Sequence, residues 1–116
     1  MSVIIYHNPR CSKSRETLAL LEAQGVTPSI VKYLEETPSV DALKTLFAQL
    51  GFDSVRDMMR VKEAEYKEQN LGDSSVTDEQ LFEAMVQTPT LIERPIVVHN
   101  NQAKIGRPPE QVLEIL

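Results

Sequence analysis

The sequence of 116 residues contains one cysteine, two histidines, four glycines and no tryptophan. A single cysteine excludes an internal disulfide, a Cys-x-x-Cys dithiol and a zinc site built from several thiolates. Two histidines without clustered cysteines or acidic ligands give no basis for a metal site, so we expect none. The four glycines are far apart, which excludes a Walker loop and a dinucleotide-binding glycine pattern.

Long apolar runs are also missing. The longest, such as residues 3–6, extend over only a few residues, which excludes a transmembrane segment. The N-terminus has neither a basic lead nor an extended apolar stretch, so we expect no signal peptide. Together with the single cysteine, this favours a reducing compartment, the cytoplasm. The length and a composition of 41% apolar and 25% charged residues predict one globular domain over residues 1–116.

The charge is unevenly distributed along the chain. The net charge of −5 disfavours anionic partners. Residues 1–15 and residues 94–109, however, contain three cations each and no Asp or Glu, so the rest of the chain carries −11. The first of these two acid-free windows contains the only cysteine. The chain has no extended basic face, so we expect no nucleic-acid partner.

The first third of the chain has a strand–helix–strand pattern. Residues 3–6 are β-branched and aromatic and predict a short buried strand, and residues 29–34 predict a second. Between them a helix is expected to begin near Ser12 or Ser14, either of which could cap it, and to end at Gly25. Two strands joined by a helix of about a dozen residues predict parallel pairing with a right-handed crossover.

The middle of the chain predicts helices. Apolar residues recur at helical spacing over residues 40–50, after Ser39 and before Gly51. Residues 58–60 are expected to form a short amphipathic helix. Residues 77–80 have capping-box spacing and begin a further amphipathic helix.

The last third of the chain returns to strands. Residues 96–98 and 103–105 predict an antiparallel hairpin around an Asn-rich turn over residues 99–102, with His99 on the surface. Pro108-Pro109 suits the first turn of a terminal helix that carries Val112, Leu113 and Leu116.

This order of elements predicts an α/β fold. Residues 1–35 and 90–116 are expected to form a small mixed sheet with helices packed on it. Residues 38–89 are expected to form a helical insertion between the second and third strands. No internal repeat, low-complexity tract or linker divides them.

Cys11 is the strongest candidate for chemistry. It is expected between the end of a strand and the start of a helix, where unpaired backbone N–H groups and the helix dipole stabilise an anion. Arg10, Lys13 and Arg15 lie within four residues of it, and no carboxylate does. Cations and a helix N-terminus both favour the thiolate, which is the nucleophilic form. The alternative interpretation is that this lone cysteine is a small buried apolar residue.

Three arginines are candidates for binding a substrate. Arg94 precedes and Arg107 follows the predicted hairpin, each directly before a proline, and Arg60 lies on the predicted short helix. An arginine presents a planar fork that suits tetrahedral oxyanions, so arginines that converge on a thiolate predict a phosphate-like substrate. The alternative for each is a solvated or ion-paired surface residue.

Two polar residues flank the cysteine. Ser14 is expected either to cap the helix or to donate a hydrogen bond to the thiolate. His7 ends the first strand and is expected either to help hold or deprotonate the thiol or to be purely structural. Thr17 stands where a phosphatase loop needs its arginine, which excludes that chemistry.

With these residues in place, the chain resembles the glutaredoxin-coupled arsenate reductase family nearly from end to end. The resemblance rests on four motifs: Tyr6-His7-Asn8-Pro9 leading to Cys11 and Ser14-Arg15, Met59-Arg60, Arg94-Pro95-Ile96-Val97-Val98, and Gly106-Arg107-Pro108. It implies a thioredoxin/glutaredoxin-like fold, a mixed β-sheet with a helical insertion between strands 2 and 3. It also implies a cis peptide bond at Pro95.

The same resemblance implies an activity. Cys11 would attack arsenate and form a covalent thiolate–arsenate adduct. The oxyanion would be bound by Arg60, Arg94 and Arg107. Glutathione, as co-substrate, would attack the adduct, arsenite would leave, and glutaredoxin would resolve the mixed disulfide. No bound cofactor is implied, and a chain with one cysteine has no resolving thiol of its own, which agrees with an external thiol supply.

Two other functions stay open from the sequence. The Cys11-x-x-Ser14 spacing is also that of a monothiol glutaredoxin-like thiol-disulfide oxidoreductase, which acts on glutathione mixed disulfides. A redox-sensing regulatory protein that binds a partner protein is the other alternative. Members of that branch carry a second cysteine where this chain has Ser14.

Overall fold

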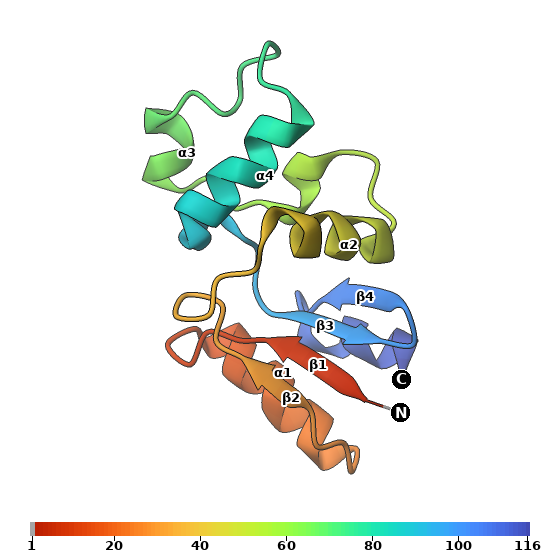
Figure 1. Ribbon diagram of the computed structural model, residues 1–116. Helices are drawn as coiled ribbons and strands as arrows, with labels where there is room; N and C mark the ends of the chain where they lie inside the picture. The colour runs from red at the N-terminus through yellow and green to blue at the C-terminus, as the bar shows by residue number, and fades with distance from the viewer. Residues whose placement is uncertain (1) are drawn as a thin grey trace. The chain divides into compact units, whose positions relative to one another are not determined.

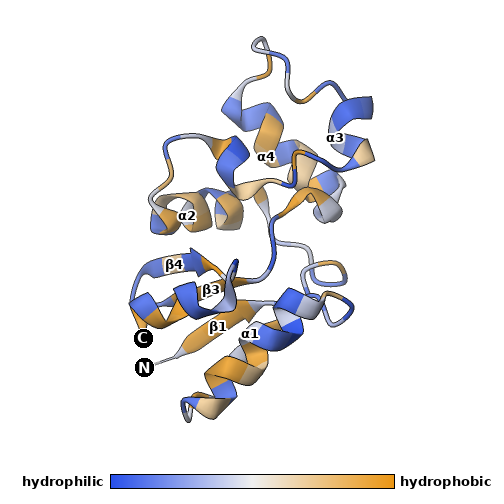
Figure 2. Cartoon of the chain, turned by 180° about the vertical axis from the view of Figure 1, so that it is seen from behind, coloured by the Kyte–Doolittle hydropathy of each residue, from blue (hydrophilic) through white to orange (hydrophobic). Residues whose placement is uncertain are grey.

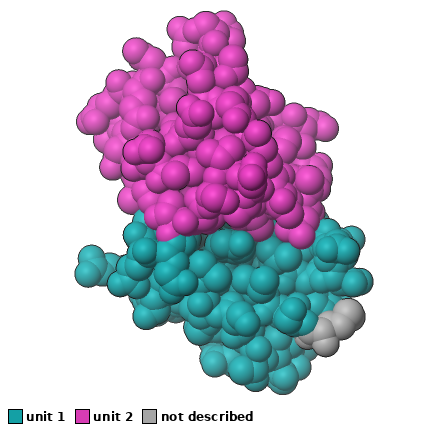
Figure 3. All heavy atoms as spheres, in the orientation of Figure 1, with its two compact units in different colours: residues 1–36, 94–116 teal, residues 37–93 magenta. Residues whose placement is uncertain are grey.

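The computed structural model describes residues 2–116, which fall into two compact units. Of the described residues, the sheet unit comprises 2–36 and 94–116, and the helical unit comprises 37–93 (Figure 3). Residues 90–93, which the sequence pattern placed with the sheet, belong to the helical unit.

The sheet unit is built on a four-stranded mixed sheet (Figure 1). The strand order is β2-β1-β3-β4, with β1 and β2 parallel and the other two pairs antiparallel. The predicted strand–helix–strand pattern, hairpin and α/β fold class are confirmed. The elements in chain order are β1 (Val3–Tyr6), α1 (Ser12–Ala23), β2 (Ser29–Val31), β3 (Ile96–His99), β4 (Gln102–Ile105) and the 3-10 helix η3 (Pro109–Ile115).

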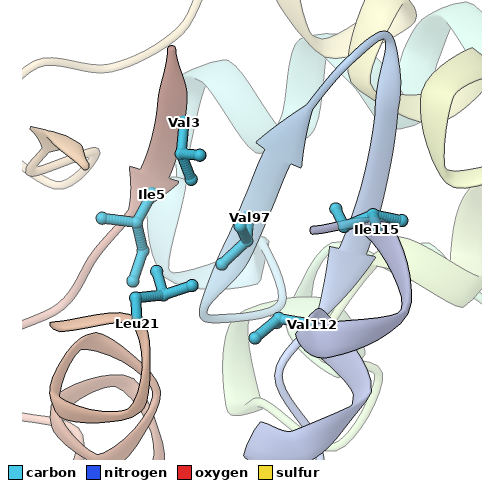
Figure 4. Close-up of a cluster of buried hydrophobic side chains, with 6 residues drawn as sticks. All are labelled: Val3, Ile5, Leu21, Val97, Val112 and Ile115. Carbon is cyan, nitrogen blue, oxygen red and sulfur yellow. The ribbon is translucent and has the colours of Figure 1, made fainter. Parts of the chain in front are cut away.

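The core of the sheet unit lies between one face of the sheet and the helices α1 and η3. Figure 4 shows the buried cluster, which consists of Val3, Ile5, Leu21, Val97, Val112 and Ile115. The predicted terminal helix is confirmed for Val112 and Leu113, whereas Leu116 lies just after its end. Leu113 and Leu116 are 37% and 43% exposed, so they do not belong to the core. The terminal helix is a 3-10 helix with three residues per turn, so Val112 and Ile115 share its inner face.

α1 begins at Ser12, so the residue that caps it is Cys11 and not a serine. Its N-cap is Cys11, in an extended conformation with φ −93° and ψ 125°, so the prediction of a cap at Ser12 or Ser14 is wrong. The other end agrees with the prediction, because α1 stops before Gly25, whose φ of +78° suits glycine.

Two further differences concern the strand ends. β2 stops at Val31 instead of residue 34, because the chain turns there and the N–H groups of Glu35 and Glu36 both donate to the Lys32 carbonyl. His99 is not in the turn: it is the last residue of β3, and its Nδ1 donates to the Ile115 carbonyl at 2.5 Å. The packing of η3 against this end of the hairpin leaves His99 only partly exposed.

The helical unit contains α2 (Val40–Leu50), the 3-10 helix η1 (Val55–Met58), α3 (Ala64–Glu68), α4 (Asp78–Gln87) and the 3-10 helix η2 (Pro89–Leu91). α2 and α4 are amphipathic, with hydrophobic and hydrophilic residues on different faces (Figure 2). Phe47 of α2 and Phe82 of α4 meet edge to face, with ring centroids 6.0 Å apart. Within residues 2–116, no helix is both long and apolar enough to cross a membrane.

The predicted short helix at residues 58–60 is confirmed only at Met58, because the helix lies earlier in the chain. η1 ends at Met58, and Met59 has an extended backbone that pairs with Ile92 in an isolated antiparallel bridge. The next residue, Arg60, donates its N–H to the Leu91 carbonyl at 2.7 Å. The bridge between Met59 and Ile92 thus joins the segment around Ile92 to the rest of the helical unit.

Candidate active site

All candidate residues of the sheet unit lie in segments that meet at the same end of the four strands, which we call the site edge of the sheet. Val31, Tyr6, Ile96 and Ile105 lie in one row across the four strands. β1 and β2 end at this row, β3 begins there and β4 ends there, because of their parallel and antiparallel pairing. The loop that contains Cys11, the segment after β2, Arg94-Pro95 and Gly106-Arg107 therefore meet at this edge.

The loop between β1 and α1 holds Cys11 by backbone hydrogen bonds. The Cys11 N–H donates to the Asn8 carbonyl at 3.0 Å, and the Arg10 N–H donates to Asn8 Oδ1 at 3.0 Å. Cys11 is 9% exposed and is the N-cap of α1. Its sulfur therefore lies where the unpaired N–H groups of the helix converge.

The environment of Cys11 favours the thiolate. Burial is the largest influence and raises the pKa of the thiol. Opposing it are the backbone N–H groups of Ser14 and Lys13 and the charges of Arg94 and Arg107. Together these groups outweigh burial, so the pKa of Cys11 is lower than that of an ordinary cysteine.

Arg94 and Arg107 approach the sulfur from the start of β3 and the end of β4. Arg107 Nη2 lies 3.7 Å from Cys11 Sγ, and Arg107 Nε donates to the Arg94 carbonyl at 2.9 Å. Arg94 Nε and Nη1 are buried and have no hydrogen-bond partner in the described part of the chain. Because a buried unpaired donor is costly, these groups favour an anionic acceptor beside the thiolate.

His7 and Ser14 form a buried polar pair under the loop. His7 Nδ1 lies 2.6 Å from Ser14 Oγ, which also accepts the Asn8 N–H at 3.0 Å. Burial is the main cause that lowers the pKa of His7, and the charges of Lys32 and Arg15 lower it further, so the ring is neutral at neutral pH. The Ser14 hydroxyl thus fixes the loop, while the Ser14 backbone N–H acts on the sulfur. A role of His7 in deprotonating the thiol stays a prediction.

Pro95 and Gly106 form a close contact beside the arginines. The Arg94–Pro95 peptide bond is cis, as the family resemblance implied. The Gly106 N–H donates to the Pro95 carbonyl at 2.9 Å, and a Cβ on Gly106 would lie 2.5 Å from Thr17 Oγ1. The contribution of Thr17 and Gly106 was missed from the sequence. A glycine directly after a predicted strand is a signal for such a close approach.

Arg60 belongs to the helical unit, whereas Cys11 belongs to the sheet unit. Its guanidinium forms an ion pair with Glu63, and its Nε lies 3.8 Å from Glu93 Oε1. These carboxylates would compete with an oxyanion for the same donors. Binding of an oxyanion by Arg60 stays a prediction. Among residues 2–116, no group of three or more His, Cys, Asp or Glu side chains is placed to hold a metal ion.

The fold and the site together define a class of protein. A parallel strand–helix–strand unit joined to an antiparallel hairpin, with a cysteine at the start of the first helix and a cis-proline before β3, makes this a thioredoxin-like protein with a single thiol. The chain belongs to the ArsC family, whose model matches residues 6–115.

Individual relatives cover nearly the whole chain. An arsenate reductase of Haemophilus influenzae is 56% identical over 116 residues, which is 100% of both chains. The uncharacterized protein YfgD of Escherichia coli K12 is 60% identical over 114 residues, 98% of this chain and 96% of that protein. The solved structure of an arsenate reductase from Vibrio cholerae is 68% identical, with a TM-score of 0.99 over 100% of this chain and 98% of that one.

Proposed function

We propose that this protein is an arsenate reductase that uses Cys11 as its nucleophile. The observation that carries the proposal is the surroundings of the sulfur. Arg107 Nη2 lies 3.7 Å from Cys11 Sγ, and two buried donors of Arg94 have no partner among the described residues. Such an arrangement suits a tetrahedral oxyanion next to a thiolate. The names of the relatives from Haemophilus influenzae and Vibrio cholerae support arsenate as that oxyanion.

The first step forms a bond between sulfur and arsenic. The Cys11 thiolate attacks arsenate, an oxygen leaves as water after protonation, and arsenic stays As(V) in a covalent adduct. Arg94 and Arg107 bind the remaining oxygens and neutralise the charge that develops on them. Because their charges also lower the pKa of Cys11, the same two side chains prepare the nucleophile and hold its target.

The second step needs a thiol from outside, because the chain has one cysteine. Glutathione supplies it: its thiolate bonds to the Cys11 sulfur, and the electron pair of the S–As bond leaves with arsenic as As(III). Overall, one arsenate and two thiols give one arsenite, one disulfide and one water. Glutaredoxin then reduces the mixed disulfide on Cys11 by thiol exchange, which suits a reducing cytoplasm.

A coupled assay tests the proposal. Purified protein is incubated with glutathione, glutaredoxin, glutathione reductase and NADPH, and NADPH oxidation is followed with and without arsenate. We expect arsenate-dependent oxidation that is lost in Cys11→Ser and strongly reduced in Arg94→Gln. Arg56→Gln is the matched control, because Arg56 donates to backbone carbonyls of the helical unit. Identical traces for the wild type and Cys11→Ser would overturn the proposal.

A monothiol glutaredoxin-like activity is the second candidate, because Cys11 occupies the N-cap of a thioredoxin-like α1 with Ser14 three residues later. The double variant Arg94→Lys and Arg107→Lys separates the two functions. Arsenate reduction needs the planar forks of both arginines, whereas exchange with a glutathione mixed disulfide does not. Loss of arsenate reduction with unchanged disulfide exchange supports the first candidate. Disulfide exchange by a wild type that does not reduce arsenate supports the second.

A further inference from the structure

A second recess lies beside the cysteine loop. It is a cavity of about 310 Å³, lined by residues 7–10 of the loop and by Lys32, Leu34 and Glu35 after β2. Its volume is at the lower end of the roughly 300–1,000 Å³ that is common for small-molecule sites. All of these residues belong to the sheet unit.

The cavity and the arginines lie on opposite sides of β1. β2 flanks β1 on one side and β3 flanks it on the other. The cavity is formed with the segment after β2, whereas Arg94 precedes β3 and Arg107 follows β4. The loop that carries Cys11 therefore separates the oxyanion position from the cavity, and a second molecule can occupy the cavity while the first is bound.

The charged groups of the cavity are available to a ligand. Arg10 and Lys32 contribute two positive charges and Glu35 contributes one negative charge. In the described part of the chain, none of these three side chains makes a hydrogen bond or an ion pair. The charge of Lys32 contributes to the lowered pKa of His7, so its ammonium group acts on the cysteine loop. Pro9 and Leu34, the latter 41% exposed, add apolar surface.

We propose that this cavity binds glutathione through Arg10, Lys32 and Glu35, an inference that rests on the proposed arsenate reductase function. Glutathione carries two carboxylates and one ammonium group, which match the two cations and one carboxylate of the cavity. Its thiol lies in the middle of the molecule. A tripeptide spans about 10 Å when extended, so a tripeptide held by Arg10 can place its sulfur beside the next residue, Cys11.

The position of the cavity also suits the chemistry of the second step. Displacement at sulfur brings the incoming thiolate to the side opposite the leaving group. Arsenic, bound by Arg94 and Arg107, leaves toward the β3 side of the loop. Glutathione in the cavity approaches from the β2 side, forms the S–S bond as the S–As bond breaks, and loses its thiol proton to solvent.

Direct binding tests the cavity without arsenate. S-methylglutathione keeps both carboxylates and the ammonium group but cannot react, and its dissociation constant can be measured by calorimetry. We expect Lys32→Gln and Arg10→Gln each to weaken binding about tenfold, the effect of losing one charge-assisted contact. Lys67→Gln removes the same charge from an exposed position of α3 and leaves binding unchanged. Wild-type affinity in both cavity variants, or no binding to the wild type at millimolar concentrations, overturns the proposal.

Glu35→Gln tests the orientation of the ligand. It should weaken binding of S-methylglutathione but not of the N-acetylated form, which has no ammonium group. Equal effects on the two ligands would contradict the assigned contact.

Kinetics distinguish the cavity's ligand from a protein partner. In the coupled assay Lys32→Gln should raise the KM for glutathione about tenfold and leave the KM for arsenate unchanged. A raised KM for glutaredoxin with unchanged S-methylglutathione binding would overturn the proposal, because the cavity would then bind the protein. If the wild type failed to reduce arsenate, the proposed function would fall, but the binding measurements would still decide whether the cavity takes glutathione.

Discussion

Gly106 allows the end of β4 to pass close to α1, and an alanine there has no room. A Cβ at this position would lie 2.5 Å from Thr17 Oγ1, 2.9 Å from Pro95 Cγ and 3.1 Å from Thr17 Cγ2. Thr17 is fully buried and its hydroxyl donates to the Lys13 carbonyl at 2.8 Å, so it cannot rotate away freely. Pro95 is a buried ring with no flexible end. The backbone of residues 105–107 must therefore shift in Gly106→Ala.

The expected cost is that of overpacking a well-filled site, about 1–3 kcal/mol in the free energy of unfolding. For a chain of this size, each kcal/mol lowers the melting temperature by roughly 4 °C. Urea and thermal denaturation followed by circular dichroism measure both quantities. Because the shift also moves Arg107 away from Cys11, kcat/KM for arsenate should fall more than stability alone explains.

A double-mutant cycle tests whether Thr17 causes the effect. Thr17→Ala removes both the oxygen and the methyl group that the new Cβ would meet, and alone should cost about 1 kcal/mol for the lost buried hydrogen bond. In the double variant Gly106→Ala and Thr17→Ala, the decrease in the free energy of unfolding should be smaller than the sum of the two single decreases by at least about 1 kcal/mol. Thr17→Ser keeps the oxygen and should not rescue Gly106→Ala. Additive losses, or a stable Gly106→Ala, would refute the reasoning.

Three further predictions concern charge, a turn and a helix cap. Arg94→Gln should raise the pKa of Cys11, because one of the charges that stabilise the thiolate is removed. The pH profile of alkylation by iodoacetamide should then move to higher pH, whereas the profile of the control Arg56→Gln should not move. An unchanged profile in Arg94→Gln would contradict the effect of the Arg94 charge on Cys11. Asn101 has a φ of +62°, so Asn101→Gly should stabilise the chain by about 0.5–1 kcal/mol and Asn101→Ala should destabilise it, as measured by urea denaturation. Thr77→Ala should cost about 1 kcal/mol, because it removes the side-chain acceptor of the capping box; an unchanged urea midpoint would contradict this role.

Elements whose limits depend on neighbouring residues could be predicted from the sequence. Ser39 caps α2 by accepting the Ala42 N–H, and Gly51 ends the helix with a φ of +72°. The Thr77 capping box begins α4 as its spacing predicts. In these places the partner that decides the conformation lies within four residues, so the local chemistry is sufficient.

Elements whose limits depend on distant residues were not predictable in the same way. Ser14 is drawn into the interior by His7, seven residues earlier, and so does not cap α1. Met59 is extended because it pairs with Ile92, which is 33 positions later in the chain. At Met59 the local pattern favoured a helix, and a contact made only in the folded chain overrode it. Ser14 is helical, but it lies inside α1 and not at its N-cap, which is Cys11.

The site also has one part that depends on neighbouring residues and another that depends on distant ones. Cys11 could be singled out from its neighbours, because three cations without a carboxylate surround it in the sequence. That Arg107 reaches its sulfur, across 96 positions of sequence, depends on the pairing of β1, β3 and β4. The close approach of Gly106 to Thr17 depends on how β4 and α1 pack, which no spacing in the sequence encodes.

The net charge of −5 is a poor guide to what the protein binds, and the sheet explains why. Both acid-free windows, residues 1–15 and 94–109, contribute to the same sheet edge, so cations far apart in sequence act on one sulfur. At physiological ionic strength the field of an exposed charge is screened within about 8 Å. Carboxylates beyond that distance scarcely affect the thiolate, whereas Arg94 and Arg107 act on it directly. An acidic protein can therefore present a cationic site wherever its topology gathers segments that lack acids.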